Sequence, residues 1–220
     1  MKILKITFLF CSFSFLFIAC KKDDSDKLPS TQQEQLTIEQ DQFKEDANGW
    51  TIIGDAQGGY VAASYSPDGG VQDGYIYAVD DVVGGVWYFN APSSYLGDKS
   101  DFYNATLSYS LFQNSKMEDQ FLFEDIIFQS DSLTLFYMYD SQTDFPKDEW
   151  TNYSIKINEN TPGWYIGTYK NSYNGPIQPH NPATKAEMEQ VLSNLTFFMI
   201  RGEFEVGEDS GGMDNVFIKK

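Results

Sequence analysis

Histidine, arginine and cysteine are nearly absent from this 220-residue sequence, which holds one, one and two of them respectively. A single histidine, His180, excludes metal sites built from several imidazoles and leaves one candidate for an imidazole base. Both cysteines, Cys11 and Cys20, lie in the first twenty residues, so the rest of the chain folds without a disulfide. Basic residues number 15 against 32 acidic ones, a formal net charge of -17 at pH 7. This deficit argues against binding to nucleic acid and against docking of the folded domain on an anionic membrane.

Residues 1–19 have the pattern of a lipoprotein signal peptide. Lys2 and Lys5 precede an apolar segment, 6–18, that is too short for an ordinary transmembrane helix. The segment runs into Leu-Phe-Ile-Ala-Cys, which resembles a bacterial lipobox, so we expect Cys20 to be the lipidated residue. An ordinary signal peptide cleaved nearby is the alternative.

Residues 20–42 predict the lipidated cysteine followed by a flexible polar tether, because this stretch has too few large apolar residues to order itself. The sequence Lys22-Asp23-Asp24 resembles an export tag that sends some Gram-negative lipoproteins to the outer face. We therefore expect an outer-membrane lipoprotein at the cell surface, with a periplasmic orientation as the alternative.

The remainder, 43–220, predicts one antiparallel β domain. Apolar and polar residues alternate with period two, as in Leu107, Tyr109 and Leu111, and about ten such short runs are separated by turn formers. The run Leu133–Met138 is apolar at nearly every position, which indicates a strand covered on both faces. Many short strands without repeated helices are typical of a two-sheet sandwich.

One short helix is predicted near the C-terminus. Thr184 and Glu187 have the spacing of a capping box, in which each side chain satisfies an amide of the first turn. Apolar residues then recur on one face of the helix, at Met188, Val191, Leu192 and Leu195. We expect this helix to close one end of the sandwich.

Several ordered motifs resemble the laminin B domain, also called laminin domain IV. They are Gly-Trp-Thr at 49–51, Gly-Asp-Ala-Gln-Gly-Gly at 54–59, Gly-Tyr-Ile-Tyr-Ala at 74–78, Val-Trp-Tyr-Phe-Asn-Ala-Pro at 86–92, Leu-Gly-Asp-Lys-Ser at 96–100, Val-Leu-Ser-Asn-Leu at 191–195, Ile-Arg-Gly-Glu at 200–203 and Met-Asp-Asn-Val at 213–216. The resemblance spans 43–220 and implies an antiparallel jelly-roll β-sandwich, similar to galactose-binding and carbohydrate-binding modules and to receptor adhesion domains. The family offers no catalytic motif. Laminins embed this domain among cysteine-rich repeats, which this chain lacks, so laminin's network role does not transfer.

Arg201, the sole arginine, lies inside the apolar run Phe197–Phe204. Its guanidinium is suited to a carboxylate partner, so we expect a partly buried structural ion pair. The candidate partners are Asp80, Asp98 and Asp214. An arginine that faces a ligand is the alternative.

The acidic residues also suggest a structural calcium site, because calcium takes carboxylate oxygens from several loops. Asp41 and Asp46 precede the first predicted strand, and Asp214 begins the last one, so antiparallel pairing of the chain ends would bring them together. Solvated surface carboxylates are the alternative.

The segment Thr161–Asn181 is rich in tyrosine, tryptophan and asparagine, a composition that binding loops use. We expect its exposed members to contact a ligand, and the candidates are Tyr169, Asn171, Tyr173 and Asn174. Trp164 and Tyr165, by contrast, read equally well as core residues of one strand.

These observations favour a non-enzymatic, surface-tethered binding or adhesion module for a glycan or matrix polymer. A serine hydrolase is disfavoured because the chain has no Gly-x-Ser-x-Gly motif and His180 lies in a predicted loop. The alternatives are a structural accessory lipoprotein that binds an envelope protein and, last, a polysaccharide-degrading enzyme using two carboxylates.

Overall fold

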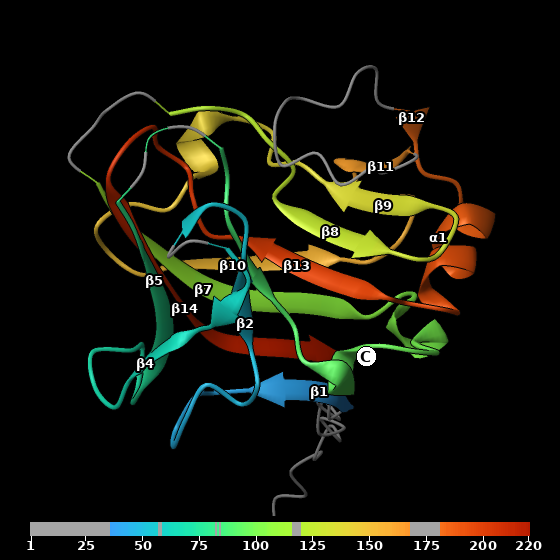
Figure 1. Cartoon of the computed structure of the whole chain (residues 1–220). Coiled ribbons are helices and arrows are strands. Elements are labelled where there is room, and N and C mark those ends of the chain that lie inside the picture. Colours follow the sequence, from blue (N-terminus) through green and yellow to red (C-terminus); the bar gives the residue numbers. More distant parts are fainter. Residues whose placement is uncertain (1–35, 57–58, 82, 84, 116–119, 168–180) are drawn as a thin grey trace, which may run out of the picture. The chain divides into compact units, whose positions relative to one another are not determined.

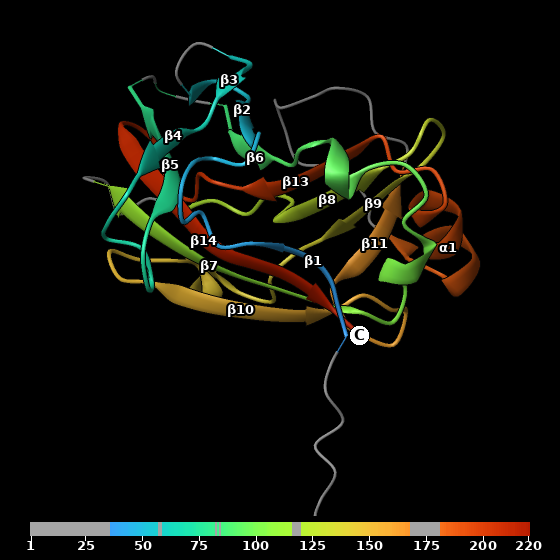
Figure 2. The same ribbon diagram turned by 90° about the horizontal axis from the view of Figure 1, so that it is seen from below.

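A computed structural model describes residues 36–56, 59–81, 83, 85–115, 120–167 and 181–220. These residues form two antiparallel sheets that pack face to face, as the two views in Figures 1 and 2 show. The all-β class predicted from the sequence is therefore confirmed. Within the described ranges, no helix combines the length and the apolar character needed to cross a bilayer.

The first sheet has six strands in the order β10-β7-β14-β5-β4, and β1 pairs with β14 beside this path. Its strands are β1 (Thr37–Asp41), β4 (Ser64–Ser66), β5 (Tyr75–Asp80), β7 (Thr106–Ser115), β10 (Thr151–Lys156) and β14 (Asp209–Lys219). The two long strands, β7 and β14, form the centre of this sheet and share its longest ladder.

The second sheet has eight strands in the order β12-β11-β9-β8-β13-β6-β2-β3. Its strands are β2 (Thr51–Ile53), β3 (Val61–Ala62), β6 (Tyr88–Asn90), β8 (Ile126–Gln129), β9 (Thr134–Tyr137), β11 (Trp164–Gly167), β12 (Asn181–Pro182) and β13 (Phe197–Arg201). The 3₁₀ turns η2 (Ser93–Tyr95), η3 (Ser100–Phe102) and η4 (Gln142–Asp144) lie in the connections.

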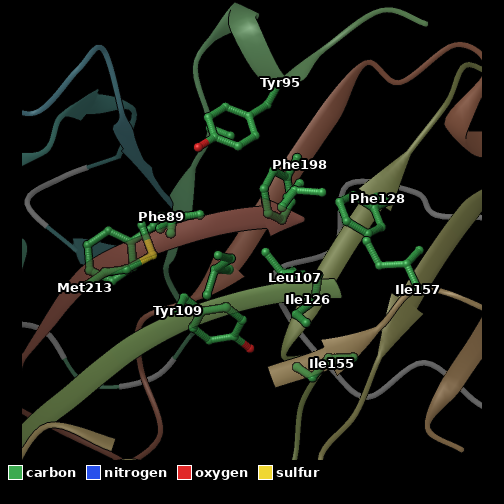
Figure 3. Packing of buried hydrophobic residues seen from close by; sticks show 14 of the residues in the cluster. Phe89, Tyr95, Leu107, Tyr109, Ile126, Phe128, Ile155, Ile157, Phe198 and Met213 are labelled. Carbon is green, nitrogen blue, oxygen red and sulfur yellow. The ribbon is translucent and has the colours of Figure 1, made fainter. Parts of the chain in front are cut away.

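The core lies between the sheets because period-two alternation turns every second side chain inward. Leu107, Tyr109 and Leu111 of β7 are at most 1% exposed, as the alternation predicted. Figure 3 shows Leu107 close to Phe128 of β8 and Phe198 of β13, so side chains from both sheets meet in one apolar layer.

Strand β9 is covered on both faces, which confirms the expectation from its continuous apolar sequence. Leu135 belongs to the core between the sheets, whereas Phe136 belongs to a second buried cluster on the other face of the eight-stranded sheet. The members of that cluster are Val86, Tyr88, Phe123, Ile127, Phe136 and Met199.

Helix α1 (Lys185–Leu192) begins where the sequence predicts. The Thr184 side chain accepts a hydrogen bond from the Glu187 amide, and the Glu187 carboxylate accepts one from the Thr184 amide, which completes the capping box. The predicted apolar face is buried at Met188, Val191 and Leu192. The helix packs against β8, β9 and η3.

The folded domain begins earlier than the sequence indicated. Residues 37–41, assigned to the tether, form β1, which pairs with β14 from Thr37↔Lys219 to Asp41↔Val216. Only Ile38 of this strand packs against the core as a hydrophobic residue. Main-chain hydrogen bonds to β14 therefore order the segment, and hydrophobic content alone could not reveal them.

Candidate functional site

Of the residues predicted to bind a ligand, Tyr169, Asn171, Tyr173 and Asn174 lie outside the described residues, as do His180 and Cys20. The strand before them is described. Trp164 of β11 is 3% exposed and stacks on Phe128 with ring centroids 5.7 Å apart, while Tyr165 is half-buried against Phe136. Trp164 and Tyr165 therefore follow the alternative interpretation, in which they are residues of one packed strand.

A group of half-buried aromatic rings lies on the outer side of the six-stranded sheet. Tyr75 and Tyr77 alternate along β5 with Ile76 and Ala78, which are fully buried in the core, so the tyrosines face away from it. We call this surface the outer aromatic face, and its members are Tyr75, Tyr77, Phe112 and Trp150.

The four rings hold one another in place across three segments of the chain. Tyr75 lies 5.6 Å from Phe112 and 5.4 Å from Trp150, and Phe112 lies 4.8 Å from Trp150, all edge to face. The Trp150 indole also donates a 3.0 Å hydrogen bond to the Gly69 carbonyl. A Cβ at Gly212 would lie 2.1 Å from the Phe112 ring, so glycine is required where that ring crosses β14. The packing of these rings against one another therefore preorganises the outer aromatic face.

A polar pocket continues from the aromatic face along the same side of β7 and β10. Ser108 and Ser110 precede Phe112 on the outward side of β7, and the Ser110 hydroxyl donates a 2.6 Å hydrogen bond to Asn152. The pocket encloses about 290 Å³ and is lined by Gln42, Gln72, Ser108, Tyr109, Ser110, Asn152, Tyr153, Asn215 and Phe217. Among the described residues, no charged side chain lines it.

Arg201 forms the buried ion pair that the sequence predicts, but with a different partner. Its Nη1 lies 3.2 Å from Oδ1 of Asp125, and both side chains are at most 2% exposed. The prediction that the partner is Asp80, Asp98 or Asp214 was wrong. The pairing of β13 with β8 places Asp125 beside Arg201, and the Arg201 amide donates a hydrogen bond to the Asp125 carbonyl.

The Arg201 guanidinium is fully enclosed. Nη2 donates a 2.7 Å hydrogen bond to the Phe121 carbonyl and Nε donates to the Glu203 carbonyl. The rings of Phe121 and Phe204 lie 4.5 and 4.4 Å from its central carbon. This arginine is therefore a structural residue, and its side chain does not reach the surface.

The chain ends meet as predicted, through β1 and β14, but the predicted calcium ligands each have protein partners. Asp41 accepts hydrogen bonds of 2.7 Å from both the Trp50 indole and the Asn48 side chain. Asp46 accepts one of 2.6 Å from the Asn48 amide, and Asp214 accepts one of 2.8 Å from an amide in the β4–β5 connection. A calcium ion at these residues stays a prediction.

A different set of carboxylates comes together at the ends of other strands. Carboxylate oxygens of Asp55, Asp80 and Glu203 lie within 4.8 Å of one another, the one such group among the residues that the structure describes. Asp209 stands directly opposite Asp80 in the β5–β14 ladder. We call this set the buried acidic cluster, and its members are Asp55, Asp80, Glu203 and Asp209.

Burial dominates the electrostatics of the buried acidic cluster. Desolvation, with further repulsion from Asp55, Asp209 and Asp80, raises the pKa of Glu203 to about 9. Desolvation and repulsion from Asp80 raise the pKa of Asp209 to about 8. The sequence missed this cluster because its members are far apart along the chain and no spacing motif joins them.

Comparison with known proteins identifies a matching family and solved structures of similar fold. The laminin B (domain IV) family matches residues 88–219, more than half of the chain. The L4b domain of human laminin alpha-2 has a TM-score of 0.60 at 13% identity, over 82% of this chain and 96% of that chain. The solution structure of CtCBM11 has a TM-score of 0.51 at 11% identity, over 87% and 99%.

The family 11 carbohydrate-binding module of the cellulosomal cellulase Lic26A-Cel5E of Clostridium thermocellum has a TM-score of 0.48 at 11% identity, over 84% and 93% of the two chains. Among curated protein sequences, none matches this chain. The L4b domain and CtCBM11 share the fold described above, which confirms the predicted jelly-roll β-sandwich.

Proposed function

Because this chain belongs to the laminin B (domain IV) family, we propose that it is a non-catalytic binding module, and that its ligand is a neutral glycan. The outer aromatic face with its adjoining polar pocket is the proposed site. A sandwich of the same kind is found in CtCBM11, a carbohydrate-binding module by name.

The observation that carries this proposal is that the described lining of one pocket is uncharged in a strongly acidic protein. The described residues that line the polar pocket offer amides, hydroxyls and aromatic rings, although the chain has a net charge of -17. A pocket at the end of β5, by contrast, is lined by four acidic residues, Asp80, Asp81, Glu208 and Asp209. An uncharged surface suits a ligand that presents hydroxyl groups and apolar ring faces without charge of its own.

The two parts of the site have different tasks. The half-exposed rings of Tyr75, Tyr77 and Trp150 offer flat apolar area on which sugar rings stack, at low cost in conformational entropy because the rings already pack together. The side chains of Asn152 and Asn215 offer both donors and acceptors, which select among hydroxyl patterns. Affinity thus comes from the rings and selectivity from the pocket.

Replacement of Trp150 by alanine tests the site. We expect at least a tenfold loss of retention in affinity electrophoresis on a bound polysaccharide, about 1.4 kcal/mol, because the indole supplies a central stacking surface. Tyr60→Ala is the matched control, since Tyr60 is 65% exposed and lies outside both the aromatic face and the pocket. Equal retention of both variants, with unchanged urea denaturation, would place the binding surface elsewhere.

We propose further that the module is held at the outer membrane, facing outward, by a lipid on Cys20. The apolar segment before Ala19 and the polar stretch after Cys20 support this anchoring. Cys20→Ala is expected to abolish labelling by a fatty-acid probe and to release the protein from the membrane fraction. Labelling that persists in this variant would exclude Cys20 as the lipidated residue.

A further inference from the structure

The buried acidic cluster gathers four carboxylates from separate segments of both sheets. Asp55 follows β2, Glu203 follows β13, and Asp80 and Asp209 occupy the facing ends of β5 and β14. Glu203 and Asp80 are each 1% exposed and Asp209 is 5% exposed. Carboxylates concentrated in this way repel one another and lose hydration, so their approach requires a compensating positive charge or protons.

Several oxygen atoms in and beside the cluster have no protein donor. Oε2 of Glu203 and both carboxylate oxygens of Asp55 are buried without a hydrogen-bond partner. Gln113 of β7 is 2% exposed and donates its amide NH₂ to Asp209, which leaves its Oε1 buried and unpartnered next to the same site. The lone pairs of this buried amide carbonyl need a partner, and a protonated carboxyl or a cation held among the carboxylates would supply it.

Three of the four carboxylates have no cationic partner among the described residues. Over the described part of the chain, no lysine or arginine lies within ion-pair distance of Asp55, Glu203 or Asp209. Arg201, which is near in sequence, is paired with Asp125 and gives only a main-chain contact to Glu203.

We propose that the buried acidic cluster binds one calcium ion. Its donors are carboxylate and amide oxygens without histidine or cysteine, a set that selects hard cations over zinc or copper. Calcium accepts six to eight oxygens in flexible geometry, which suits ligands drawn from four segments, whereas magnesium keeps most of its water.

A pocket of about 250 Å³ borders the cluster at Asp80 and Asp209. This pocket is lined by Val79, Asp80, Asp81, Asn114, Glu208, Asp209 and Ser210. Its acidic walls attract cations toward Asp80 and Asp209, where the pocket meets the cluster. The pocket therefore brings a cation next to two of the four carboxylates.

This site is separate from the one predicted at the chain ends. Asp209 and Asp214 are five residues apart on β14, about 17 Å along an extended strand. Figure 1 shows β5, whose end carries Asp80, on the side of the domain away from α1. The ion would join β2, β5, β13 and β14, and so tie the two sheets together at that end.

Thermal unfolding of the full chain tests the proposal. After removal of metals with EDTA, millimolar calcium is expected to raise the melting temperature of the wild type by several degrees, because an ion that binds only the folded state stabilises it. Asp55→Asn, at the least buried ligand, is expected to remove most of this shift. Asp214→Asn is the matched control and is expected to keep it.

Terbium luminescence gives a readout that does not depend on stability. Terbium replaces calcium at oxygen sites, and the Trp87 ring, which packs against Gly202 and Gly211 beside Glu203, would sensitise its emission. We expect emission that calcium quenches by displacement, with at least tenfold weaker binding in Asp55→Asn. Two results would overturn the site. One is the same melting temperature in EDTA and in calcium, together with no sensitised terbium emission. The other is a calcium-induced rise in melting temperature that Asp214→Asn loses and Asp55→Asn retains.

Discussion

Replacing Arg201 by methionine is expected to lower the free energy of unfolding by about 3–5 kcal/mol, since it leaves the buried Asp125 carboxylate without its cation. For a domain of this size the corresponding fall in melting temperature is about 10 °C. Methionine keeps much of the apolar length of the arginine side chain, so the loss reports the missing charge and hydrogen bonds rather than a cavity. Urea denaturation measures it.

The loss should depend on pH in a defined direction. Burial raises the pKa of Asp125 to about 7, and the Arg201 guanidinium acts against that rise. Without the guanidinium the pKa of Asp125 rises further, so the folded variant retains the proton to higher pH than the wild type. The destabilisation is therefore smallest near pH 5, where Asp125 is protonated in both proteins, and grows as the pH rises through 7 toward 9.

Lys185→Met is the matched control for the loss of one cation. Lys185 lies 3.6 Å from Glu189 in a solvent-exposed pair on α1, and such pairs contribute about 0–1 kcal/mol. An Arg201→Met variant that is as stable as Lys185→Met, yet fails to bind glycan, would reassign Arg201 from the structural ion pair to the ligand.

Gly54→Ala is expected to lower the free energy of unfolding by about 3–5 kcal/mol, the sum of backbone strain and overpacking. Gly54 has a φ of +119°, where a side chain is strained. Its Cβ would also lie 2.3 Å from the Val86 carbonyl oxygen and 2.6 Å from the Trp87 Cα, and main-chain atoms of a packed segment move only at high cost.

Gly59→Ala separates the two causes. Gly59 has a φ of +117°, almost the same as that of Gly54, but no atom lies within 4 Å of the Cβ position. Only strain remains there, about 1–3 kcal/mol. Urea denaturation gives the free energy of unfolding of both variants, and the difference between them measures the close approach of Gly54 to residues 86–87. Equal losses of unfolding free energy in the two variants would contradict that approach.

Periodicity in the sequence was a reliable guide where one face of an element meets the core. The alternation at Leu107, Tyr109 and Leu111 and the capping box at Thr184 are both local patterns, and both elements formed as predicted. Strand β1 was missed because its order comes from main-chain pairing with β14, about 175 residues away, and its own side chains bury little apolar area.

The functional surfaces were harder to predict because they depend on which strands become neighbours. Tyr75 and Tyr77 alternate with Ile76 in the sequence, but nothing local shows that Trp150, just before β10, joins them. Likewise, Asp80 and Asp209 become a facing pair only through the β5–β14 register. The same register dependence explains why the partner of Arg201 was misassigned.

A glycan array probed with the unit 35–220 tests the central claim, that the outer aromatic face and the adjoining polar pocket bind a neutral glycan. The expected result is binding to a restricted set of neutral oligosaccharides, lost in Trp150→Ala, retained in Tyr60→Ala, and without release of reducing sugar during incubation. Three results would contradict this claim: binding confined to anionic glycans, no binding to any glycan, or release of reducing sugar from a bound glycan.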